Sequence, residues 1–221
     1  MDARLIVALC VGTVLMLGIL LVCRKWYGFS VNKTLLLAPV LTFFGFASVK
    51  ILFFIENGGW TGLSFYGAVL LIPLWFIVVA RMINLPYADV VDCTAPAICA
   101  MLALMKVQCI AWGCCAGRIL YKTEAGEAVR FPSQIIEMVN AVVIMLVLLQ
   151  LMRKGKNRGK IYPWFMLIYG ITRLFWNIFR ETTPYIWILP AGSFWSLIAI
   201  VIGIIWLGIG QKRQGNKWCS S

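Results

Sequence analysis

The segment QIIEMVNAVVIMLVLLQLMRKGKNRGK, residues 134–160, joins a long apolar run to a strongly basic one. Residues 134–152 are mostly Ile, Val, Leu, Met and Ala, over a length close to the ~20 residues that a membrane-spanning helix needs. Residues 153–160 then supply five Lys and Arg. Because such residues gather in cytoplasmic loops, the segment predicts a helix that crosses a membrane and ends at the cytoplasm.

The composition of the whole chain supports a membrane protein. Hydrophobic residues make up 62% of the 221 residues and charged residues 13%, whereas soluble domains have roughly 45–50% and about 25%. The mean hydropathy is +0.90. The net charge of +12 lies between the apolar runs, so it indicates membrane topology and not a nucleic-acid partner.

Seven apolar runs are long enough to be spans, and we expect one membrane domain over residues 1–221. The expected spans are about 5–23, 35–55, 64–80, 88–112, 134–152, 162–179 and 192–210. We predict an all-α integral membrane protein, because backbone groups in hydrocarbon must bond within their own segment. The loops after the first, third and fifth runs and the C-terminal tail carry most of the Lys and Arg, so the N-terminus is expected outside and the C-terminus in the cytoplasm.

Three ionisable residues lie deep within these runs, at Asp92, Lys106 and Arg173. Ionisable groups at membrane depth are costly and usually mark a functional site, although simple ion pairing within the bundle is the alternative. Arg can donate two hydrogen bonds to the oxygens of one phosphate, and Lys adds a point charge. We therefore expect Lys106 and Arg173 to converge on an anionic phospholipid head group.

The stretch KVQCIAWGCCAGR, residues 106–118, combines cations, glycines and thiols at the end of the fourth run. Gly113 and Gly117 would break the helix and turn backbone N–H groups towards an anion, or form a tight packing seam. Cys109, Cys114 and Cys115 allow a metal site, a vicinal disulfide or simple packing. The chain has no histidine and this stretch has no C-x-x-C pair, so we expect neither a metal nor a cofactor. The polar stretch 118–134 is long for a plain connection and is expected to line a site.

Five motifs occur in the order of a known family. They are GLSFYGA (62–68), DCTAP (92–96), CIAWGCCAGR (109–118), RFPSQIIEM (130–138) and IYGITRLFWNIFRE (168–181). Residues 62–210 thereby resemble the prolipoprotein diacylglyceryl transferases, whose pattern runs H-G-G, D-x-x-A-P, G-R-x-G-x-F-x-x-G-x-x-x-G-R/K, H-P-S/T-Q-L-Y-E and Y-G-x-x-R-x-x-x-E-x-x-R. That family also has seven spans with its N-terminus outside.

The resemblance implies an enzyme of the bacterial cytoplasmic (inner) membrane. Its activity would move the diacylglyceryl group of phosphatidylglycerol onto the lipobox cysteine thiol in the signal peptide of a prolipoprotein. A thioether would form and glycerol phosphate would leave. The expected partners are therefore phosphatidylglycerol, the prolipoprotein and the membrane itself.

The resemblance also assigns site residues. The expected catalytic residues are Tyr66, Asp92, Lys106 and Arg173. The expected substrate-binding residues are Gly67, Gly113, Gly117, Arg118, Ser133, Gln134, Glu137, Tyr169, Asn177 and Arg180.

Several positions depart from the family pattern. Tyr66 stands for the His of H-G-G, Lys106 for the Arg of G-R-x-G, Phe131 for the next His, and Asn177 for a Glu; Met105 and Gln108 replace glycines and Ser193 a Gln. Tyr is a poor base because its pKa is near 10, so the expected base is Asp92, or else the cations stabilise a thiolate that already exists. The alternatives are a non-catalytic relative that binds phospholipid head groups or lipidated peptides, and an enzyme that uses another nucleophile or lipid.

Overall fold

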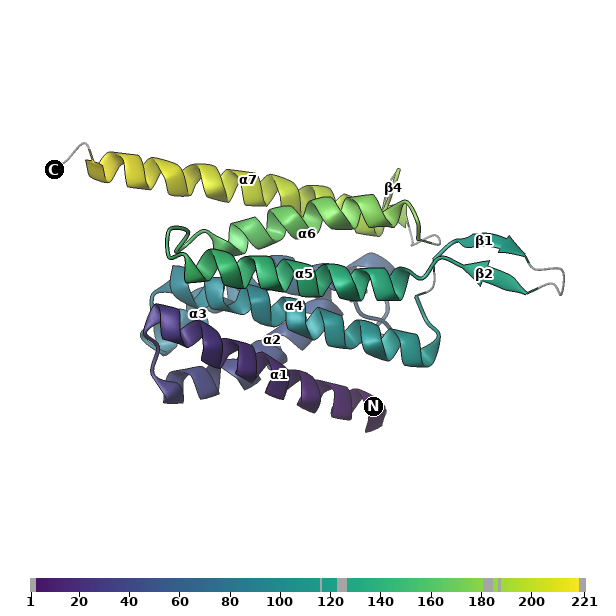
Figure 1. The fold of residues 1–221 in the computed structure, drawn as a ribbon, viewed down its shortest axis with the longest axis horizontal. Coiled ribbons are helices and arrows are strands. Elements are labelled where there is room, and N and C mark those ends of the chain that lie inside the picture. The colour runs from purple at the N-terminus through teal and green to yellow at the C-terminus, as the bar shows by residue number, and fades with distance from the viewer. Residues whose placement is uncertain (1–2, 116, 123–126, 181–184, 187, 219–221) are drawn as a thin grey trace.

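The computed structural model describes residues 3–115, 117–122, 127–180, 185–186 and 188–218, which form a bundle of long helices (Figure 1). Within these residues the helices are α1 (Ala3–Tyr27), α2 (Val31–Asn57), α3 (Tyr66–Met82), α4 (Tyr87–Trp112), α5 (Ser133–Arg153), α6 (Ile161–Asn177) and α7 (Ala191–Trp218). The strands are β1 (Ile119–Lys122), β2 (Ala128–Arg130), β3 (Tyr185–Ile186) and β4 (Leu189–Pro190).

The helices explain the apolar runs of the sequence. Five of them, α1, α2, α4, α5 and α7, are long and apolar enough to cross a membrane. The other two, α3 and α6, have 17 residues each, or about 25 Å at 1.5 Å per residue, against a hydrocarbon core of about 30 Å. The fold is mostly helical and is consistent with the predicted all-α membrane protein.

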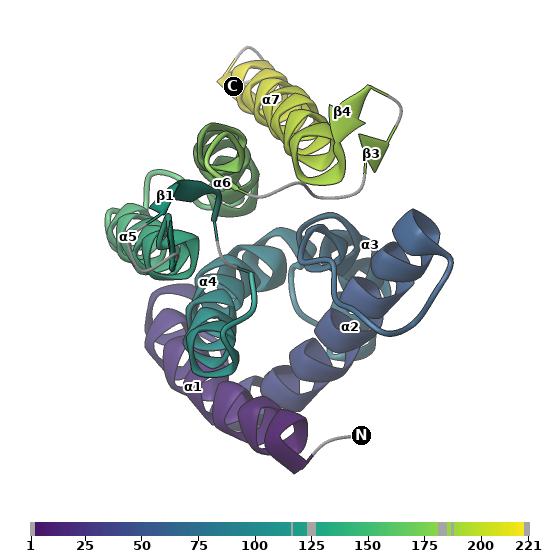
Figure 2. The same cartoon turned by 90° about the vertical axis from the view of Figure 1, so that its right-hand side faces the viewer.

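The centre of the bundle is α4. Of its most apolar stretch, 78% is buried inside the protein, whereas the other four long helices bury only 17–28% of theirs. Small residues such as Cys93, Ala95, Ala97 and Cys99 lie on its buried surface and let neighbouring helices approach closely. Figure 2 shows α4 in the middle, with α6 and α7 paired at one side of the bundle.

The polar connection between α4 and α5 forms a hairpin that the sequence analysis did not predict. Strands β1 and β2 pair antiparallel, with Ile119 opposite Arg130 and Lys122 opposite Ala128. The hairpin projects from the bundle and its side chains are mostly exposed (Figure 1). We expected the stretch 118–134 to line a site. Among its described residues, Arg118 and Phe131 contact Phe179 after α6, whereas the two strands are mostly exposed.

The two ends of the bundle differ. The hairpin and the start of α1 lie at one end, which we call the hairpin end (Figure 1). The basic loop 153–160 and the end of α7 lie at the other, which we call the basic end (Figure 1). Because α4 runs from the basic end to the hairpin end, it carries residues to both.

Candidate active site

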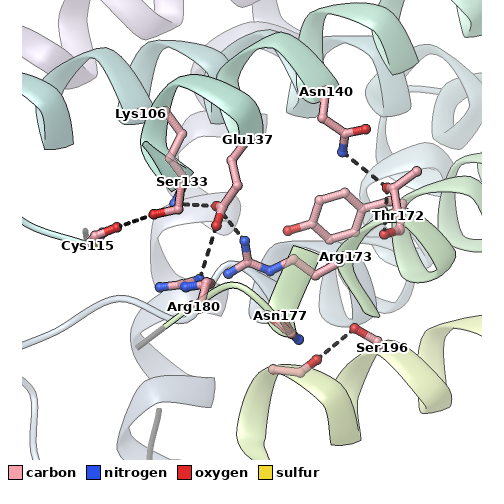
Figure 3. A network of polar contacts seen from close by, with 12 residues as sticks. Lys106, Cys115, Ser133, Glu137, Asn140, Thr172, Arg173, Asn177, Arg180 and Ser196 are labelled. Carbon is pink, nitrogen blue, oxygen red and sulfur yellow. Dashed lines mark hydrogen bonds and ion pairs between the residues drawn. The ribbon is translucent and has the colours of Figure 1, made fainter. Parts of the chain in front are cut away.

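Glu137, in the first turns of α5, lies buried at the hairpin end among three cations (Figure 3). Its Oε2 atom is 2.6 Å from the Lys106 Nζ and also pairs with an Nη of Arg173. Its Oε1 atom is 3.4 Å from an Nη of Arg180. The expected convergence of Lys106 and Arg173 on one place is confirmed, and Glu137 and Arg180 join them there. We call these four residues the clamp.

The helix ends explain why the clamp forms. Lys106 lies in the last turns of α4, Glu137 at the start of α5 and Arg173 near the end of α6, and these ends all meet at the hairpin end. Buried charges are tolerated only when they are paired. Among the described residues, three cations here face one carboxylate, so the clamp carries an excess of two positive charges. Such an excess favours an anionic ligand.

A cavity of about 190 Å³ lies beside the clamp. Its lining includes Glu56, Tyr66, Tyr169, Arg173, Arg180 and Trp195, which come from α2, α3, α6, α7 and the segment after α6. The volume is enough for several water molecules or a small polar group. Two of the three clamp cations therefore reach an open space, while Lys106 lies behind Glu137.

Tyr66 is held by a serine of α7. The Tyr66 hydroxyl lies 2.5 Å from the Ser196 Oγ, and Ser196 donates its own proton to the Gly192 carbonyl at 2.7 Å. Tyr66 is therefore the donor in its bond to Ser196. Sequence reasoning missed Ser196, although a serine within the apolar run 192–210 is a signal in itself.

Tyr169 and Asn177, both expected to bind substrate, lie in α6 beside this pair. The ring of Tyr169 packs against that of Tyr66 with centroids 5.5 Å apart and lines the cavity. Asn177 donates to the Ser193 Oγ at 3.4 Å, so it links α6 to α7. Of these two residues, only Tyr169 lines the cavity.

The glycines have structural roles. A Cβ on Gly67 would overlap the Ser48 carbonyl of α2, and one on Gly117 would lie 2.6 Å from the Phe131 carbonyl oxygen. Gly113 caps α4 with a left-handed φ of 65°. Gly67 and Gly117 were both expected to bind substrate, but the groups that approach them closely are protein backbone.

Three further residues hold the segments around the clamp in place. Ser133 donates to the Cys115 carbonyl and Gln134 to the Cys114 carbonyl, each at 2.7 Å. The Arg118 Nε donates to the Arg180 carbonyl at 3.1 Å. The structure thus places the expected substrate-binding residues Arg118, Ser133 and Gln134 near the clamp, where their side chains bond to backbone.

Asp92 is far from the clamp. Its carboxylate accepts hydrogen bonds from the Tyr27 hydroxyl at 3.1 Å and from the backbone N–H groups of Gly159 at 2.6 Å and Tyr162 at 3.0 Å, at the basic end. It precedes Lys106 by 14 positions on α4, or about 21 Å along the helix axis. The structure does not bring the expected base to the rest of the site.

Glu56 is the carboxylate that the sequence analysis missed. It lies in the last turn of α2, lines the cavity with Tyr66 and Arg173, and accepts a hydrogen bond from the Ser64 Oγ at 2.8 Å. The predicted second span stopped at residue 55, so Glu56 was not counted among the groups at membrane depth. The end of α2 at Asn57 brings it within the helix.

Three thiols gather beside the clamp. The Sγ atoms of Cys109, Cys114 and Cys115 all lie within 4.8 Å of one another. A hydrogen bond with Cys109 and the nearby Lys106 ammonium lower the pKa of the Cys115 thiol to about 6. No disulfide joins these residues.

Comparisons with known proteins show which proteins this chain resembles. A protein of Aeromonas hydrophila is 29% identical over 212 residues, which are 89% of this chain and 72% of the relative. Proteins of Polaromonas naphthalenivorans and Idiomarina loihiensis are 28% identical over 171 and 174 residues, which are 71% and 74% of this chain. The matches cover 62% and 64% of those two relatives, so this chain spans a little less than two thirds of their length.

All three relatives bear the name phosphatidylglycerol–prolipoprotein diacylglyceryl transferase. The family model for prolipoprotein diacylglyceryl transferase matches residues 7–209, which include every residue of the clamp and of the cavity lining. The chain therefore belongs to the prolipoprotein diacylglyceryl transferase family.

Proposed function

We propose that this chain transfers the diacylglyceryl group of phosphatidylglycerol to the lipobox cysteine of a prolipoprotein. The observation that carries the proposal is the convergence of Lys106, Arg173 and Arg180 on Glu137 beside a cavity. The excess positive charge suits a phosphate ester, and the relatives carry the name of this activity.

The clamp would act on the phosphate. Arg173 and Arg180 line the cavity and would hold the phosphate oxygens of phosphatidylglycerol. When the bond between the glycerol carbon and the phosphate oxygen breaks, the leaving glycerol phosphate gains negative charge. Cations positioned in advance stabilise that charge, which lowers the barrier. Glu137 would keep the three cations together in the absence of substrate.

The thiol must lose its proton before its sulfur attacks the glycerol carbon. A cysteine with a pKa near 8.5 is only a few per cent thiolate at pH 7. The Tyr66 hydroxyl already donates to Ser196 and is no base. Glu56 lines the same cavity, and we propose that its carboxylate accepts the thiol proton. The new carbon–sulfur bond then replaces the carbon–oxygen bond, and glycerol phosphate departs.

We further propose one membrane domain with seven crossings in the bacterial inner membrane, including the shorter α3 and α6. The N-terminus would lie outside and the C-terminus in the cytoplasm. Support comes from the five Lys and Arg of loop 153–160, which lies at the same end as the end of α7. In that orientation the clamp lies towards the outer face of the membrane.

The test is a transfer assay with the purified full chain in phosphatidylglycerol vesicles. A lipobox peptide should gain the mass of one diacylglyceryl group, while the same peptide with Ser for Cys should not. Vesicles of phosphatidylcholine should give no product if the glycerol phosphate leaving group matters. Absence of product in every lipid, with the protein folded, would overturn the proposal of catalysis.

One alternative function has its own support. The family's His and Glu positions carry Tyr66 and Asn177 here, and Asp92 is remote from the clamp. A non-catalytic relative would keep the clamp and bind the phospholipid head group or a lipidated peptide. Phosphatidylglycerol binding that depends on Arg173, without any product, would select this alternative.

A further inference from the structure

The end of α4 and the turn after it hold a group of cysteines that the proposed reaction does not use. Cys109 and Cys114 are half-buried, Cys115 is exposed, and all three are free thiols. Their Sγ atoms lie within 4.8 Å of one another. A residue spacing of five and one is unlike the C-x-x-C pairs of common metal sites, so the sequence alone disfavours this grouping.

The helix cap produces the grouping. Gly113 adopts a left-handed φ of 65°, its N–H donates to the Ile110 carbonyl, and the N–H of Cys114 donates to the Cys109 carbonyl at 3.1 Å. This reversal folds residues 114 and 115 back over the last turn of α4. Cys115 itself has a φ of 61°, which costs energy for a residue other than glycine and persists only where surroundings impose it.

The sulfur positions suit one small ion. Zinc–sulfur bonds are about 2.3 Å long, so sulfurs in a tetrahedral site lie about 3.8 Å apart. Three sulfurs already within 4.8 Å need only small rotations to reach that arrangement. With three protein ligands, the fourth position would stay open to water on the exposed side of Cys115.

One cation lies close to the group. Lys106 is one helical turn before Cys109 on α4. Thiolates bind soft or borderline ions such as Zn²⁺ and Cu⁺ more strongly than hard ions such as Mg²⁺. The chain has no histidine, and the ligand atoms that this group offers are its three sulfurs.

We propose that Cys109, Cys114 and Cys115 bind one thiophilic metal ion, with Zn²⁺ as the ion of best fit. The ion would tie the end of α4 to the turn that follows it. That turn is bonded to α5 through Ser133 and Gln134, four and three positions before Glu137. Metal binding would therefore stabilise the start of α5 and the position of Glu137 in the clamp.

The test is a metal titration of the reduced full chain in detergent micelles without oxygen. Co²⁺ serves as a coloured substitute for Zn²⁺. We expect a cobalt–thiolate absorption band that saturates at about one ion per chain and disappears when Zn²⁺ is added. Cys109→Ser, Cys114→Ser and Cys115→Ser should each lose the band, whereas Cys10→Ser, which removes an exposed thiol of α1, should keep it.

A second measurement keeps the test independent of folding and of enzyme activity. Hydrogen exchange of residues 133–137 should slow when Zn²⁺ is added to the unaltered chain and to Cys10→Ser, and should not change in Cys115→Ser. Helical circular dichroism confirms that each variant is folded. A band that survives all three substitutions, a folded chain that binds no ion, or a disulfide that forms in place of metal binding would each overturn the proposal.

Discussion

Two buried carboxylates at opposite ends of the bundle show how differently the same chemical group can be used. At the basic end, Asp92 accepts hydrogen bonds from a tyrosine hydroxyl and two backbone N–H groups, all of them neutral. At the hairpin end, Glu137 faces three cations. Neutral donors satisfy the carboxylate without leaving charge for a ligand, whereas the cations around Glu137 outnumber it and stand beside a cavity.

The comparison teaches that an ionisable residue at membrane depth is not enough to locate a site. Asp92 joins the start of α6 to α4 and α1, so its role is structural. Glu137 gathers charges from α4, α6 and the segment after α6, which prepares a place for an anion. Substitutions at the two ends should therefore separate loss of activity from loss of stability.

Arg173→Ala should have the largest effect. Its removal takes a cation from the cavity wall, and loss of one donor to a developing negative charge costs about 10²–10³-fold in kcat. The measurement is the rate of peptide lipidation in phosphatidylglycerol vesicles. Arg158→Ala is the matched control, because Arg158 pairs with Asp89 at the basic end. Equal losses of lipidation rate in the two variants would contradict the assignment of activity to the hairpin end and of stability to the basic end.

Glu56→Gln should lower the rate by about 10²-fold at pH 7, since a general base contributes about 10²–10⁴-fold. The deficit should shrink as the pH rises towards 8.5, because the substrate thiol then ionises without help. The measurement is the rate as a function of pH for both proteins. A deficit that stays constant across this range would assign Glu56 to packing around Ser64 instead.

Asp92→Asn should reduce stability and leave the activity of the folded protein unchanged. The amide keeps the shape of the side chain but turns a donor towards the N–H of Gly159 or Tyr162. Hydrogen bonds to a charged group are worth about 1.5–3 kcal/mol, so we expect a loss of about 2 kcal/mol in the free energy of unfolding. Thermal unfolding in micelles measures it, and a loss of activity per folded molecule would contradict the structural role.

Tyr66→Phe should have the smallest energetic effect of these four substitutions, and it should act on the rate. The ring stays packed against Tyr169, and only the bond to Ser196 is lost, which is worth about 1 kcal/mol, or less than tenfold. Tyr27→Phe removes the corresponding hydroxyl bond to Asp92 at the basic end and should change stability alone. A collapse of activity in Tyr66→Phe would show that the hydroxyl contacts a reacting group.

Much of the fold could be predicted from the sequence. The seven helices of the described residues match the seven apolar runs to within four residues, except that α7 continues eight residues past the predicted end at 210. The match is close because a helix in lipid must satisfy its backbone hydrogen bonds within its own segment. The hairpin of β1 and β2 could not be predicted in the same way. Its strands have three and four residues, too short for alternation of apolar and polar side chains to be recognised.

The candidate site was predicted in part. Four charged residues lie in or beside apolar runs: Lys106, Glu137, Arg173 and Arg180. Because a charge in a membrane costs free energy, its presence there is enough to make each of them a candidate site residue. Ser196 and Glu56 were missed because one is uncharged and the other lies at a helix end whose position the hydropathy pattern leaves uncertain.

The sequence by itself determined that the protein is a bundle of membrane helices with an excess of cations at depth, because hydropathy and charge are properties of residues one by one. Only the tertiary structure decided that Glu56 belongs to the cavity, that Asp92 does not, and that three thiols share one place. The physical reason is that helix ends, crossings and the left-handed cap at Gly113 set the distances between side chains. Residue spacing alone does not contain those distances.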